Sequence, residues 1–198
     1  MIDKFSRMIA HTLVEQSQIQ QEEEIIYAYL FASIGEEVGF DVVVLILGSF
    51  LKHTGISLCY LLVTTPLRHF AGGFHANTRF GCTVLSYGIF LAIILICPIV
   101  VPIYRLLWIV IYSLCWIIIY ILAPVDTANK RRPPETRVLL RHRCLITFII
   151  MTILYLYLIY QQSVLYYGSI SVCMLVCAYG LIIGVYKNKR NRIITQMQ

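Results

Sequence analysis

Charged residues are scarce in this chain. Only 13% of its 198 residues are Asp, Glu, Lys or Arg, and 59% are apolar, whereas a soluble domain usually carries about 25% charged residues. The shortage is greatest in four apolar runs, residues 80–101, 103–123, 144–160 and 164–186, where Arg105 is the one charge. Each run is about long enough to cross a hydrocarbon core of ~30 Å. The composition therefore excludes an ordinary soluble domain and predicts an all-α, polytopic membrane protein.

Several familiar signals are also missing. No apolar core with a small-residue cleavage site follows Met1, so we do not expect a signal peptide. The seven cysteines include no CxxC pair, and no His-rich repeat accompanies them, so neither a metal nor another cofactor is expected. No internal repeat or low-complexity segment divides the chain. This predicts a single integral-membrane domain over residues 1–198.

The first 21 residues differ from the apolar runs. Residues 1–21 are mostly polar, and their apolar side chains recur at helical spacing: Phe5, Met8, Ile9 and Leu13. A helix with one apolar face and one polar face lies in the plane of the membrane interface. We therefore expect an interfacial amphipathic helix here.

Three shorter apolar runs follow, at residues 25–34, 38–51 and 56–67. All are too short to be comfortable full spans. Charged and imidazole side chains interrupt them: Glu36, Glu37, Asp41, Lys52 and His53. We interpret this region as one or two spans together with half-length or re-entrant helices.

Basic residues indicate the orientation of the helices. They are concentrated in the loop 124–143 and the tail 187–198, and positive charge marks the cytoplasmic side of a membrane protein. Two predicted spans separate the loop from the tail, and two more separate it from Arg68 and Arg79. We therefore expect all three basic clusters on the cytoplasmic side. The net charge of +6 requires no nucleic-acid partner, because this topology and anionic membrane lipid account for it.

The polar stretch before the first long span is the strongest candidate for chemistry. Residues 68–82 carry Gly72, Gly73, His75 and Cys82 between apolar runs, and irregular polar backbone is tolerated at membrane depth only where protein or water covers it. Cysteine attacks carbonyl groups as the thiolate, which an imidazolium or a helix N-terminus favours. Cys82 lies in the first turn of the predicted span. We therefore expect Cys82 as the nucleophile, with His75 carrying the proton.

The spacing of this pair constrains its geometry. Seven residues on one continuous helix span roughly 10 Å along the axis, whereas a base must come within about 3 Å of the thiol or reach it through one water. The chain must therefore turn back between His75 and Cys82, or His75 must meet Cys82 of a second copy. We expect a homodimer, because short irregular helices near the N-terminus need covering. Two alternatives stay open: His69 is the base, or Cys82 is a packing residue and His75 an interfacial side chain.

These residues resemble the signature of the AgrB family, the accessory gene regulator proteins that process the AgrD propeptide of Gram-positive quorum sensing. The matching elements are Arg68, Ala71-Gly72-Gly73, His75, Cys82, the run Ala123-Pro124-Val125-Asp126-Thr127 and the basic run Asn129-Lys130-Arg131-Arg132-Pro133. The size of the chain, its polar N-terminal helix and the order of its spans are similar too. The resemblance therefore covers nearly the whole chain.

The resemblance implies a cysteine endopeptidase of a bacterial cell membrane, with His75 as base and Cys82 as nucleophile. It would cut an AgrD-like propeptide on the C-terminal side of the future signal peptide and hold the N-terminal part as an acyl-enzyme thioester. An internal cysteine or serine of the propeptide would then close a thiolactone or lactone ring. Supporting or substrate-binding roles are expected for Arg68, Gly72, Gly73, Asp126, Lys130, Arg131 and Arg132.

The same residues also suit roles outside peptidase chemistry. Arg68 and the basic loop mark the inner face of the membrane, and Asp126 followed by Thr127 suits a turn. A non-enzymatic peptide transporter or membrane scaffold would use the polar residues as a path and leave Cys82 incidental. A metal site is a third interpretation, although its ligands match no spacing motif: His53, His69, His75 and Cys82.

Overall fold

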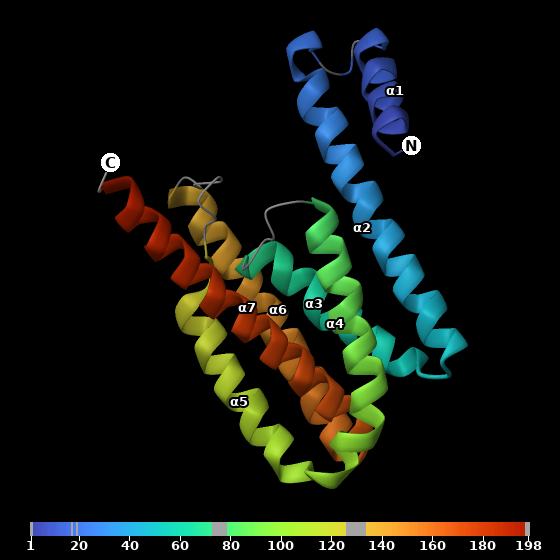
Figure 1. Ribbon diagram of the computed structural model, residues 1–198, viewed down its shortest axis with the longest axis vertical. Helices are drawn as coiled ribbons and strands as arrows, with labels where there is room; N and C mark the ends of the chain where they lie inside the picture. Colours follow the sequence, from blue (N-terminus) through green and yellow to red (C-terminus); the bar gives the residue numbers. More distant parts are fainter. Residues whose placement is uncertain (1, 17, 19, 73–78, 126–133, 197–198) are drawn as a thin grey trace. The chain divides into compact units, whose positions relative to one another are not determined.

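The computed structural model describes residues 2–16, 18, 20–72, 79–125 and 134–196. These residues form seven α-helices and two short 3₁₀ helices, with no strand among them (Figure 1). In chain order they are α1 (Ile2–Glu15), η1 (Gln21–Glu23), α2 (Glu24–Phe50), α3 (Thr54–Ala71), α4 (Arg79–Val100), η2 (Val101–Ile103), α5 (Arg105–Leu122), α6 (Pro134–Tyr160) and α7 (Val164–Gln196). The all-α fold predicted from the sequence is confirmed.

The four long apolar runs each form a helix. Within the described part of the chain, four segments are long and apolar enough to cross a membrane: Gly81–Ile103, Arg105–Leu122, Glu135–Tyr160 and Val164–Arg190. Each contains most or all of one apolar run recognised in the sequence, and the third begins nine residues earlier, at Glu135. About 20 predominantly apolar residues are enough for a helical span. The prediction of a polytopic helical membrane protein is therefore confirmed.

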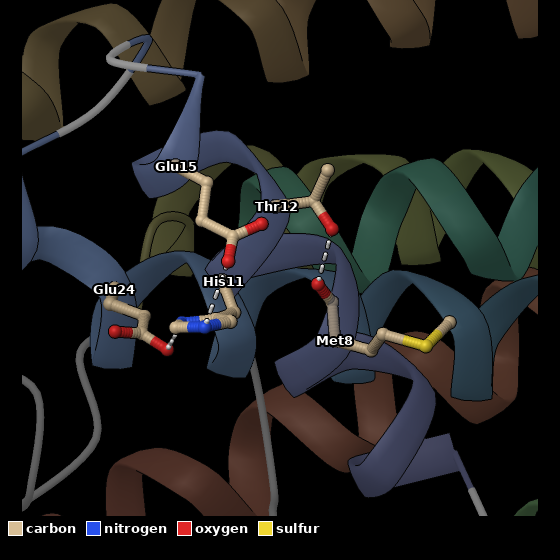
Figure 2. A network of polar contacts seen from close by, with 5 residues as sticks. All are labelled: Met8, His11, Thr12, Glu15 and Glu24. Atoms are coloured by element: carbon tan, nitrogen blue, oxygen red, sulfur yellow. Dashed lines mark hydrogen bonds and ion pairs between the residues drawn. The ribbon is translucent and has the colours of Figure 1, made fainter.

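The chain divides into two compact units, residues 1–47 and 48–198. In the first unit, Phe5 and Met8 of α1 are largely exposed, at 60% and 59%. Such exposed apolar side chains on an otherwise polar helix suit the interfacial position predicted for it. The imidazole of His11 joins α1 to the start of α2. Its Nε2 lies 3.5 Å from Oε1 of Glu15, and its Nδ1 lies 3.4 Å from Oε1 of Glu24 (Figure 2).

The structure joins two of the short apolar runs in α2. The apolar runs 25–34 and 38–51 lie largely within one continuous helix of 27 residues, and Glu36 and Asp41 are inside it. Acidic residues lower the mean hydropathy of a segment, but they do not break a helix as proline does. The chain bends only after this helix, where Lys52 adopts a φ of 59°. The shorter helix of this region is α3, with 18 residues.

In the second unit, α7 lies against α3, α4, α5 and α6 (Figure 1). Its N-terminal half is tightly packed, because a Cβ added at Gly168 would collide with the Val101 side chain. Nearby, Tyr155 stacks on Tyr112 with 3.8 Å between ring centroids and meets Tyr167 edge-on. This half of α7 therefore holds the bundle together.

Candidate active site

The candidate nucleophile begins a span, as predicted. Because α4 starts at Arg79, Cys82 is the fourth residue of the helix and lies in its first turn. The first four N–H groups of a helix lack partners within the helix, and together with the macrodipole they favour an anion there. The thiol is half-buried. The start of α4 is therefore a position where backbone N–H groups can stabilise a developing oxyanion.

A chain of hydrogen bonds connects Arg68 of α3 to the backbone of Cys82. The Nη1 group of Arg68 donates to Oγ of Ser86 at 2.9 Å, and that hydroxyl donates to the carbonyl oxygen of Cys82 at 2.8 Å. A second contact joins the same two helices, because the hydroxyl of Tyr60 donates to the carbonyl oxygen of Ser86 at 3.3 Å. Arg68 is therefore positioned beside the first turn of α4. Ser86 was not expected from the sequence, since no spacing rule links residues on different helices.

Gly72 ends α3 in a conformation that requires glycine. Its φ is +75° with a ψ of −152°, a region essentially restricted to glycine. A Cβ at this position would also collide with the carbonyl oxygen of Val125. The two segments are paired, because the N–H of Val125 donates to the carbonyl oxygen of Ala71 at 2.8 Å and Gly72 forms a parallel bridge with Val125. The two sequence motifs, one around Gly72 and the other around Val125, are thus side by side.

A cavity of about 360 Å³ opens beside Cys82. One face of α3 lines it, through Tyr60, Thr64, Leu67, Arg68 and Ala71, followed by Gly72. From α4 the lining residues are Cys82, Leu85 and Ile89, and α5 contributes Ile119. The opposite wall is α7, through Val176, Cys177, Tyr179, Gly180, Leu181 and Ile183. The cavity therefore brings Cys82, Arg68 and Gly72 together against a largely apolar wall.

Several predicted site residues lie outside the described residues: Gly73, His75, Asp126, Lys130, Arg131 and Arg132. Their expected roles stay predictions. Asp126 directly follows Val125, whose position beside Gly72 is described. His69, the alternative base, is exposed and is not one of the described residues that line the cavity.

Histidine and cysteine side chains elsewhere give no sign of a metal centre in the described ranges, where no group of three or more His, Cys, Asp or Glu residues could hold an ion. Five cysteines are buried: Cys59, Cys97, Cys115, Cys144 and Cys173. Cys177 differs from its helix neighbour Cys173, because it is only half-buried and lines the cavity with Cys82.

Comparison with known protein families gives one match. The family model described as Accessory gene regulator B (AgrB) matches residues 6–182. Both sequence motifs and all described walls of the cavity except Ile183 lie within this range. Neither the comparison with curated proteins nor that with solved structures found a match.

Proposed function

Because the chain belongs to the AgrB family, whose members are propeptide-processing membrane proteins, we propose that it is a membrane-embedded cysteine endopeptidase acting on an AgrD-like propeptide. The observation that carries the proposal is the position of Cys82. It lies in the first turn of a membrane-spanning helix and lines a cavity together with Arg68 and Gly72. A packing cysteine would need neither the cavity nor the helix start.

The first chemical step is attack of the Cys82 thiolate on the carbonyl carbon of the scissile peptide bond. The carbonyl oxygen becomes an oxyanion, which backbone N–H groups at the start of α4 stabilise together with the positive end of the helix dipole. His75, having taken the thiol proton, returns it to the nitrogen as the C–N bond breaks. The C-terminal fragment leaves as an amine, and the N-terminal fragment stays on the Cys82 sulfur as a thioester.

The second step closes the ring. A propeptide thiol gives its proton to His75, which is neutral after the first step, and its sulfur attacks the thioester carbonyl carbon. The bond to the Cys82 sulfur then breaks, which forms a thiolactone and leaves the Cys82 thiolate beside the His75 imidazolium. A serine hydroxyl in the same place yields a lactone. Exchange of one thioester for another is nearly balanced in energy, so the cyclisation needs no further energy source. Water competes with the internal thiol, and the largely apolar cavity lowers its access to the thioester.

The distribution of basic residues supports a cytoplasmic site. Arg68 lies in the last turn of α3, and Arg137 lies near the start of α6. The last turns of α7 carry Lys187 and Lys189. The spans α4 to α7 alternate in direction, so these ends lie on one side of the membrane, which the positive-inside rule assigns to the cytoplasm. We propose that the propeptide approaches from this side along the lipid interface.

Other residues of the family motifs have proposed supporting roles. The Arg68 guanidinium, held by Ser86, is placed to bind a carbonyl or carboxylate of the substrate. Gly72 allows the backbone to pass close to Val125, and Gly73 is proposed to let the substrate backbone approach. Asp126 is proposed to orient His75. The basic residues Lys130, Arg131 and Arg132 are proposed to bind the acidic part of the propeptide.

Intact-mass spectrometry tests the function directly. Purified protein in lipid is mixed with its cognate AgrD-like propeptide, with Cys82→Ala and His75→Ala in parallel. We expect a covalent adduct with the mass of the N-terminal fragment in the wild type and in neither variant. If all three proteins bind the propeptide but leave it uncut, the peptidase proposal is wrong. A peptide transporter or membrane scaffold then becomes the favoured function.

A further inference from the structure

Gly180 lies at the centre of the α7 wall of the cavity. On a helix, the neighbours of any residue on the same face are those three and four positions away. For Gly180, three of these four neighbours line the cavity: Val176, Cys177 and Ile183. A side chain at position 180 would therefore project into the cavity.

No close contact explains a glycine at this position. A Cβ added at Gly180 meets no atom within 4 Å, whereas one added at Gly48, Gly55 or Gly168 would collide with a neighbouring side chain. Glycine in a helix interior costs roughly 0.5–1 kcal/mol relative to alanine. The effect of Gly180 is to leave free a volume that any side chain would occupy.

We propose that the cavity is the specificity pocket for the acyl residue of the substrate, the residue whose carbonyl carbon Cys82 attacks, and that Gly180 sets the size of side chain it accepts. This inference rests on the proposed peptidase function. Such a pocket favours a large apolar side chain at the acyl position. Gly180 acts through the shape of the pocket and takes no part in the chemistry.

The walls of the cavity define this chemistry. Apart from Arg68, its lining carries no charged side chain among the described residues, and Leu85, Ile89 and Val176 present hydrocarbon. Burying a charged side chain against such walls is costly, so an apolar occupant is favoured. The volume, about 360 Å³, is at the low end of the roughly 300–1,000 Å³ typical of small-ligand sites. It therefore suits one or two side chains of a bound peptide.

The retained half of the substrate is the better occupant. The acyl residue stays bonded to the Cys82 sulfur until the ring closes, while the C-terminal fragment must depart. Because the Cys82 sulfur borders the cavity, a side chain bound there holds the acyl residue in place and excludes water from the thioester. Side-chain contacts to the departing residue would instead slow its release.

The test compares Gly180→Leu with Gly88→Leu. Gly88 lies on α4, is exposed, accepts a Cβ with no atom within 4 Å, and does not line the cavity. Both variants carry the same change in a membrane-spanning helix, so they differ only in whether the new side chain enters the cavity. The substrates are the cognate propeptide with Leu, Phe or Ala at the acyl position, which the adduct mass on wild-type Cys82 identifies.

We expect the wild type and Gly88→Leu to form the adduct with the Leu and Phe substrates at least about tenfold faster than with the Ala substrate. Gly180→Leu loses about tenfold or more on the large substrates and loses less on the Ala substrate, so its preference for Leu over Ala falls. Adduct formation with the Ala substrate also shows that the variant is folded. Gly180→Ala adds a smaller side chain, so we expect a smaller loss of rate, greater with the Phe substrate than with the Leu substrate.

Three results would overturn the pocket assignment. One is an unchanged Leu-to-Ala preference in both Gly180 variants; another is an equal loss in Gly88→Leu. The third is measured with Leu, Phe or Ala placed instead at the residue after the scissile bond: a preference at that residue that changes in Gly180→Leu would assign the cavity to the departing side. Failure of the proposed function is distinguishable from these, because the wild type would then form no adduct with any of the substrates.

Discussion

Gly168 and Gly180 lie twelve residues apart on the same helix, and their surroundings are opposite. At Gly168 the helix approaches the Val101 side chain so closely that no Cβ fits, whereas at Gly180 an added Cβ meets nothing within 4 Å. Residues 164–174, here called the packed half of α7, hold the bundle. Residues 176–183, the cavity half, form the wall facing Cys82.

The difference shows how one helix serves two purposes. In the packed half, Tyr155 of α6 reaches the α7 hydroxyl of Ser171 at 3.0 Å and donates to the carbonyl oxygen of Trp108 at 3.2 Å. The indole N–H of Trp108 in turn donates to the carbonyl oxygen of Val101 at 3.0 Å. Such buried hydrogen bonds and close contacts fix the position of α7. The cavity beside residues 176–183 can then remain unfilled, because the packed half keeps α7 in position.

Placing the same large side chain in each half gives the largest expected effect. Gly168→Leu forces a side chain against Val101, which is fully buried, and overpacking of this kind lowers the free energy of unfolding by about 3 kcal/mol or more. Gly180→Leu projects into free volume and changes stability by less than about 1 kcal/mol. Unfolding of the protein in mild-detergent micelles by a denaturing detergent, followed by tryptophan fluorescence, measures both. Equal losses in the two variants would contradict the distinction between the halves.

Gly72 also lines the cavity, and its substitution tests whether every residue beside this open volume tolerates a side chain. Gly72→Ala places a side chain at a φ of +75° and against the carbonyl oxygen of Val125, which costs about 2–3 kcal/mol. Because the end of α3 then separates from Val125, we also expect adduct formation on Cys82 to fall about 100-fold, the typical effect of a 1 Å misplacement.

Gly88→Ala is the matched control for Gly72→Ala, because a Cβ there meets no neighbour. It should leave both stability and adduct formation close to wild type. Wild-type behaviour of Gly72→Ala in both measurements would mean that the pairing of Gly72 with Val125 has no part in the site.

The sequence predicts the membrane-spanning helices and the position of Cys82 for a physical reason. Lipid forces long apolar runs into helices, so the end of the polar stretch fixes the start of α4 and places Cys82 in its first turn. The length of α2 was harder to predict, because Glu36 and Asp41 lower the hydropathy without breaking the helix.

The remaining features of the site depend on contacts between distant residues. No pattern in one sequence pairs Gly72 with Val125 or places Ser86 between Arg68 and the Cys82 carbonyl. Gly180 resembles any glycine in an apolar run, since its role comes from a cavity built by three other helices. The roles of His75, Asp126 and the basic loop stay predictions.

Removing one hydroxyl from each half gives a smaller effect. Tyr155→Phe loses both the bond to the Trp108 carbonyl and the contact with Ser171, and a buried hydrogen bond contributes about 1 kcal/mol. Tyr179→Phe makes the same change in the cavity half, where the residue is 65% exposed, so we expect a loss below about 0.5 kcal/mol. The same detergent titration compares the two. A larger loss of stability for Tyr179→Phe than for Tyr155→Phe would mean that the stabilising contacts of α7 are in its cavity half.

The smallest effect is expected at Thr64 in the α3 wall of the cavity. The Thr64 hydroxyl donates to the carbonyl oxygen of Tyr60, one turn earlier in the same helix, at 2.7 Å. Such a back-bond adds little to helix stability, so Thr64→Val should change the free energy of unfolding by less than about 0.5 kcal/mol. If the cavity recognises its occupant by shape and hydrocarbon contact, adduct formation with large apolar acyl residues stays within about threefold of wild type. A tenfold loss confined to one substrate would instead show that the Thr64 hydroxyl binds the peptide, and the pocket would then select a polar group as well as a size.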